Sequence, residues 1–255
     1  MSRTDTDAVL ADLNERGYDV TRLDGDGPVA VAAGGEAPGA VTDRPLAVEP
    51  ISRPSPLTLA SYLAGAASKE QAVLFVADDR TGHRATSVLE QPFLLAAEHD
   101  GHREFYTVPD RILLQDGGYA AVRTDGSLTW REEPADGTLT DGGTDAPRLL
   151  LETEGEAVAA FDSVAALTCP GPTADAFPYR YEREGDKRVH VYDRQRDVGR
   201  YAGVAAMKAN AYRPVPLPLV PEHHVRENRA LARAWTVATV TDGEVTYTTA
   251  TAPGR

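Results

Sequence analysis

The chain has only one cysteine, Cys169, among its 255 residues. An internal disulfide is therefore excluded, and so is a metal site built from several cysteines. Cys169 lies in a turn-like stretch, Thr168-Cys169-Pro170-Gly171-Pro172, with no histidine close in sequence to lower its pKa. We expect a structural thiol there, not a nucleophile.

Lysine is also scarce: Lys69, Lys187 and Lys208 are the only lysines, and arginine supplies the rest of the 26 basic residues. These oppose 39 acidic residues, for a net charge of -13. The combination resembles the proteins of halophiles that accumulate salt, in which carboxylates keep the surface hydrated and soluble. The Debye length falls to about 3 Å at 1 M salt, so a local cationic patch on such a protein can still bind an anion.

Long apolar runs are missing as well. A representative run, 72–77, is far shorter than the roughly 20 residues that a membrane-spanning helix requires. The first residues, 1–7, are polar and do not suggest a signal peptide. We expect no membrane association and a cytoplasmic location.

Short catalytic and cofactor motifs are absent too. The sequence has no Gly-x-Ser-x-Gly elbow, zinc-protease motif, dinucleotide-binding glycine loop or Gly-Lys-Ser/Thr phosphate loop. No cofactor is evident, and a binding protein is favoured over an enzyme.

The residue pattern predicts an α+β fold, in which a mixed α/β N-terminal lobe precedes an antiparallel, hairpin-rich C-terminal lobe. Helices are expected near 5–16, 57–68 and 85–91, and a buried strand at 71–77. Residues 134–147 are rich in Gly and lack apolar anchors, so they predict a flexible loop or linker between lobes 1–133 and 148–255. A single intertwined domain is the alternative.

Four hairpins are expected. Two of them pair 93–98 with 103–108 and 119–123 with 127–131. In the third, avoidance of opposed arginines sets Arg180 opposite Tyr192 and Glu182 opposite His190. In the fourth, Asp242-Gly243 forms a two-residue turn that sets Val240 opposite Val245 and closes the C-terminal lobe.

The candidate catalytic site follows the buried strand 71–77, where Asp78, Asp79 and His83 precede the expected helix. Open α/β sheets bind ligands at such strand ends. Paired carboxylates suit Mg²⁺, and His83 would serve as a base. This interpretation requires a concave pocket lined by all three residues. The alternative is that they are ordinary turn and capping residues.

The charge reverses in residues 180–235, which hold 12 basic and 7 acidic side chains, whereas residues 1–179 hold 13 and 30. Arginine binds phosphates and tyrosine stacks on bases, so this segment predicts an anion or nucleic-acid surface. The candidate residues are Arg180, Arg188, Arg194, Arg196, Arg200, Tyr192, Tyr201, Arg226, Arg229 and Arg233.

Three functions follow from these patterns. The first is a non-catalytic binding or assembly protein whose Arg/Tyr surface binds nucleic acid or another polyanion. The second is a Mg²⁺-dependent or phosphate-ligand enzyme with its site after strand 71–77. In the third, the basic segment has a structural role and its arginines pair with carboxylates of the acidic lobe. The polyanion interpretation fails if most of the candidate arginines pair with carboxylates.

Overall fold

The computed structural model describes residues 3–25, 27–35, 44–133, 148–167, 171–221 and 235–249. The α-helices of this part of the chain are α1 (Arg3–Glu15), α2 (Pro56–Ala67), α3 (Asp79–Leu89) and α4 (Val204–Ala209). Two short 3-10 turns cover Val164–Leu167 and Ala174–Ala176.

The strands fall in three groups along the chain. The first comprises β1 (Asp19–Arg22), β2 (Ala30–Ala33), β3 (Leu46–Pro50), β4 (Ala72–Ala77), β5 (Leu95–His99) and β6 (His102–Phe105). The second comprises β7 (Thr107–Arg111), β8 (Tyr119–Arg123), β9 (Thr129–Glu133), β10 (Arg148–Thr153), β11 (Glu156–Phe161) and β12 (Tyr179–Arg183). The third comprises β13 (Val189–Asp193), β14 (Arg196–Tyr201), β15 (Tyr212–Pro214), β16 (Pro216–Pro218), β17 (Trp235–Thr241) and β18 (Glu244–Thr249).

The chain divides into two compact units. Unit 1 consists of Met1–Leu95 and Pro221–Arg255, and unit 2 of Ala96–Val220. Unit 2 is thus an insertion between α3 and β17 of unit 1. With four α-helices among the described residues and mostly antiparallel sheets, the α+β class is confirmed.

Unit 1 is built on a mixed sheet with strand order β1-β2-β3-β4-β17-β18. Its central strands β3, β4 and β17 are parallel, and the outer strands pair antiparallel. All six residues of β4 are buried, as expected for an apolar strand covered on both faces.

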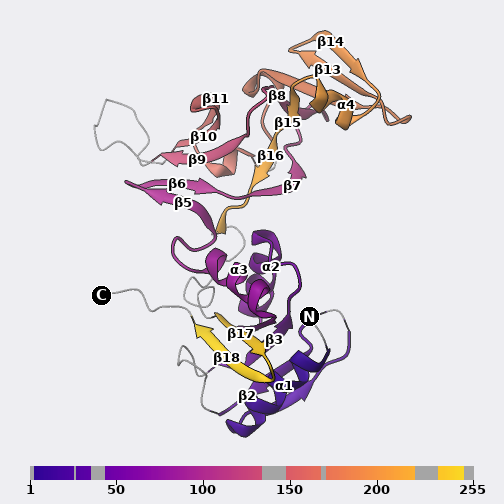
Figure 1. Ribbon diagram of the computed structural model, residues 1–255. Coiled ribbons are helices and arrows are strands. Elements are labelled where there is room, and N and C mark those ends of the chain that lie inside the picture. The colour runs from indigo at the N-terminus through magenta and orange to yellow at the C-terminus, as the bar shows by residue number, and fades with distance from the viewer. Residues whose placement is uncertain are drawn as a thin grey trace. The chain divides into compact units, whose positions relative to one another are not determined.

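Helices cover both faces of this sheet (Figure 1). On one face, α1 contributes Val9, Leu10 and Leu13 to a core that includes Leu74 and Val76 of β4. Side chains alternate along a strand, so Phe75 points to the opposite face, where its ring lies 6.2 Å from that of Tyr62 on α2. On that same face, α3 packs against β17 at Gly82, where a β-carbon would meet the side chains of Thr239 and Val237.

Unit 2 is antiparallel throughout its described strands. Its sheets have the orders β11-β10-β9-β6-β5, β14-β13-β12-β8-β15 and β16-β7 (Figure 1). Trp130 is fully buried, packs near Phe161, and donates its indole N–H to the Pro216 carbonyl at 2.8 Å. A second core under α4 contains Tyr181, Val191 and Met207.

The registers expected for two hairpins are confirmed. Arg180 lies opposite Tyr192 and Glu182 opposite His190 in the β12–β13 pair. Val240 lies opposite Val245 in the β17–β18 pair. The latter hairpin closes unit 1 instead of a C-terminal lobe, because β17 pairs in parallel with β4.

Another sequence expectation is corrected by the strand pairing. Strands 119–123 and 127–131 do not form a hairpin: β8 pairs with β12 and β15, whereas β9 pairs with β6 and β10. The turn between them instead binds Arg213, which donates to the Thr124 and Asp125 carbonyls. Residues 134–147, expected as a loop or linker between lobes, lie outside the described residues.

Candidate anion site in unit 1

A cavity of about 520 Å³ lies where two parallel strands of unit 1 end. One wall is the connection from β3 to α2, and the other is the connection from β4 to α3 together with the first turns of α3. Its lining residues are Ser52, Arg53, Pro54, Ser55, Asp78, Arg80, Thr81 and Arg84. Adjacent parallel strands place their following loops at one edge of the sheet, which explains why segments distant in sequence line one cavity.

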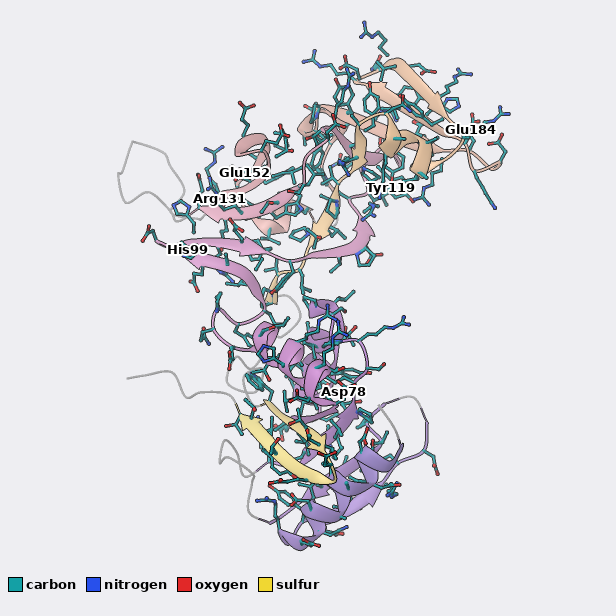
Figure 2. The ribbon with its side chains drawn as sticks, in the orientation of Figure 1. Asp78, His99, Tyr119, Arg131, Glu152 and Glu184 are labelled. Carbon is teal, nitrogen blue, oxygen red and sulfur yellow. The ribbon has the colours of Figure 1, made fainter. Side chains whose placement is uncertain are left out.

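Both helices begin at this cavity with a side-chain cap. Ser55 caps α2 by accepting a hydrogen bond from the Thr58 N–H at 3.1 Å. Asp78, which follows β4 and is labelled in Figure 2, caps α3 by accepting from the Thr81 N–H at 2.8 Å. The first turn of a helix also has N–H groups with no acceptor inside the helix, here those of Leu57, Asp79 and Arg80. Two helix N-termini therefore direct positive potential toward the cavity.

Three arginines add full charges to this potential. Arg80 and Arg84 are four residues apart, so they lie on the same side of α3. Arg53 comes from the facing connection. No ion pair joins any of the three to a carboxylate of the described residues, and all three side chains are exposed. Asp78 is the single carboxylate among the lining residues.

Of the three residues expected in a catalytic site, only Asp78 lines the cavity. The helix starts at Asp79 instead of residue 85, and this places Asp79 and His83 on an exposed stripe that is one residue out of phase with Arg80 and Arg84. The Thr81 N–H hydrogen bond holds the pKa of Asp78 below its ordinary value. Its carboxylate therefore serves as a helix cap.

A shared cation is not supported by this arrangement. Among the residues that the structure describes, no group of three or more His, Cys, Asp or Glu side chains is placed to hold a metal ion. The cavity is instead lined by cations, which repel a metal and attract an anion.

The Arg/Tyr segment of unit 2 differs from this cavity, because most of its described candidate arginines form ion pairs with carboxylates. Arg188 is 2.9 Å from Asp186, Arg200 is 2.9 Å from Asp197, and Arg196 is 3.8 Å from Asp193. Arg180 contacts both Asp116 and Glu182 and lies over the Tyr192 ring, 4.5 Å from its centroid. Arg194 has no such pair within the described part of the chain.

The tyrosines of this segment mostly pack within unit 2. Tyr201 lies 6.0 Å from Tyr212, ring to ring, and packs against the core that contains Met207. Four of the five described candidate arginines thus bind nearby carboxylates, chiefly of their own hairpins and not of the lobe 1–133. Arg226, Arg229, Arg233 and Cys169 lie outside the described residues.

Sequence reasoning missed the cationic lining, although a signal for it was present. The spacing of Arg80 and Arg84 would have placed them on one side of a helix that began at Asp79. Arg53 had no local signal, because only the parallel pairing of β3 with β4 brings it to this edge.

No transmembrane-length apolar helix occurs among the described residues. Comparison of the chain with protein-family models, curated proteins and solved structures finds no match.

Proposed function

We propose that the protein binds a small phosphate-bearing ligand in the cavity of unit 1. The observation that supports this proposal most strongly is the convergence of Arg53, Arg80 and Arg84 with the N-termini of α2 and α3. Guanidinium groups donate paired hydrogen bonds to phosphate oxygens, and helix N-termini supply backbone donors.

The size of the cavity favours a small molecule over a polymer. Its volume of about 520 Å³ lies within the range of sites for metabolites and cofactors. Ser52, Ser55 and Thr81 line the same space. Ser55 and Thr81 already take part in the two helix caps, so Ser52 is the residue whose hydroxyl suits a further polar group of such a ligand.

The chemistry of the lining favours binding over catalysis. A general acid or base needs a titratable group within reach of the ligand. The only carboxylate here, Asp78, already accepts the helix-capping hydrogen bond, and His83 is not among the lining residues.

A polyanion surface on unit 2 forms no part of the proposal. Arg180, Arg188, Arg196 and Arg200 have carboxylate partners within 4 Å, which neutralise the charge that phosphates would need.

The proposal is tested by calorimetric titration of the protein with inorganic phosphate at several KCl concentrations. We expect saturable binding that weakens as KCl rises, and a loss of at least about tenfold in affinity in the Arg80→Gln/Arg84→Gln variant. Arg196→Gln is the matched control, because that arginine is exposed and lies in unit 2. Equal affinity in the wild type and the double variant would overturn the proposal.

A further inference from the structure

A second cavity, of about 340 Å³, lies entirely within unit 2. It is formed by β7, the turn after β8, the end of α4 and the strands β15 and β16. Its lining residues are Thr107, Val108, Pro109, Arg111, Gly126, Ser127, Leu128, Lys208, Arg213, Pro214 and Pro216. None of these is acidic.

Three of the lining residues carry a positive charge. Arg213 is held in place by two backbone carbonyls: its Nε donates to Thr124 at 2.9 Å and its Nη2 to Asp125 at 2.7 Å. Arg111 donates to the Asp110 carbonyl at 3.3 Å. No carboxylate of the described residues forms an ion pair with Arg111, Lys208 or Arg213, so their full charges act on this cavity.

The remaining wall of the cavity includes an apolar part. Val108, Leu128 and the rings of three prolines supply it. The strap 214–216 is fixed by the hydrogen bond from Trp130 to the Pro216 carbonyl and by one from the Ile112 N–H to the Val215 carbonyl at 3.2 Å. In Figure 1, β16, which begins at Pro216, runs beside β7, its antiparallel partner. The surface is therefore held in shape before a ligand arrives.

We propose that this cavity binds a phosphate monoester with an apolar organic group. The doubly charged phosphate would lie among Arg111, Lys208 and Arg213, and the organic group would pack against Val108, Leu128 and the prolines. Three cationic side chains favour a ligand with two negative charges, such as a phosphate monoester, over a ligand with one carboxylate. This site is independent of the cavity in unit 1, and either proposal can fail without the other.

The test uses phenyl phosphate as the probe, with inorganic phosphate and benzoate as comparison ligands. Calorimetric titrations are made on the full chain carrying Arg80→Gln/Arg84→Gln, so that binding in the unit 1 cavity is weakened and the unit 2 cavity can be measured. In this background we expect phenyl phosphate to bind more tightly than either comparison ligand. Lys208→Gln should weaken its binding about tenfold, because one charge-assisted contact is lost.

Lys208→Gln is the principal variant because the Lys208 side chain is exposed, whereas Arg213→Gln also removes two internal hydrogen bonds and can affect folding. Lys187→Gln, at an exposed lysine in the turn after β12, is the matched control and should bind as the parent does. Two results overturn the proposal: no binding of phenyl phosphate in the parent, or equal affinities in the parent and Lys208→Gln. Equal affinity for inorganic and phenyl phosphate overturns the role of the apolar wall.

Discussion

The Asp78 carboxylate accepts a hydrogen bond from the Thr81 N–H at 2.8 Å and thereby fixes the first residue of α3 at the edge of the unit 1 cavity. The start of the helix decides which side chains line the cavity: Arg80 and Arg84 do, and Asp79 and His83 do not. The same carboxylate is thus a structural element of the candidate site.

Loss of this cap should destabilise the protein. Asp78→Ala removes the acceptor, so we expect the free energy of unfolding to fall by about 1 kcal/mol, whereas Asp78→Asn retains a capping oxygen and should cost less. The lowered pKa of Asp78 adds a pH dependence: its contribution is present above the ordinary value of 3.8 and is lost as the pH falls through the folded-state pKa. Denaturant unfolding between neutral and acidic pH measures both effects; equal stability of wild type and Asp78→Ala would contradict the assignment.

The close packing of α3 on β17 depends on Gly82. A β-carbon at this position would overlap the methyl group of Thr239, so we expect Gly82→Ala to destabilise the protein by about 1–3 kcal/mol. Thr239→Ser removes that methyl group and keeps the hydroxyl that contacts Thr246 at 2.6 Å. In a double-mutant cycle, Thr239→Ser should recover part of the stability that Gly82→Ala removes. Strictly additive effects of the two substitutions would show that the residues at positions 82 and 239 are not in contact.

Glu49 on β3 should make stability depend on pH near neutrality. The residue is only 6% exposed, and burial raises its pKa from 4.5 to about 7, although Lys69 partly offsets this. Because the folded state holds the proton more tightly than the unfolded chain, stability should fall as the pH rises from about 4.5 to about 7 and then level off.

Glu49→Gln should remove this slope. At a pH of about 8 we expect the variant to be more stable than the wild type by on the order of 1–2 kcal/mol, because no buried charge forms. At a pH of about 4 the two should agree. Glu15→Gln, at an exposed position on α1, serves as the control in the same unfolding series. A wild-type slope that survives in Glu49→Gln would assign the titration to another group.

Arg180 should matter for stability more than the exposed arginines beside it. Its side chain is 15% exposed, contacts Asp116 and Glu182, and lies over Tyr192. Arg180→Gln leaves these carboxylates without their cation, and we expect a loss of about 1–3 kcal/mol. Arg200→Gln, whose pair is largely exposed, should cost less than about 1 kcal/mol. Thermal melts of both variants give the comparison, and the reverse order would contradict the structural role of Arg180.

Local patterns were sufficient for the elements whose determinants lie close together in the sequence. The β12–β13 register followed from the charges on either side of Gly185, and the β17–β18 register from Asp242-Gly243. The buried strand β4 followed from its continuous apolar run.

The division into units depends on pairing that sequence periodicity does not encode. The parallel contact of β4 with β17 joins Val73 to Trp235 across the whole inserted unit, so the hairpin that was expected to close a C-terminal lobe extends the sheet of unit 1. The start of α3 was missed for a different reason: Asp78 was interpreted as a possible metal ligand, although the same residue type is a frequent helix cap. An error in the first residue of a helix changes which side chains are predicted to lie on the same face of that helix.

The location of a bound phosphate analogue tests the central claim most directly. Crystals of the protein grown with tungstate would reveal the anion by its anomalous scattering. The proposed function predicts a peak in the unit 1 cavity, within contact distance of Arg80 and Arg84 and facing the N–H groups that begin α2 and α3. A fully occupied tungstate elsewhere, with none between these two helix N-termini, would contradict it.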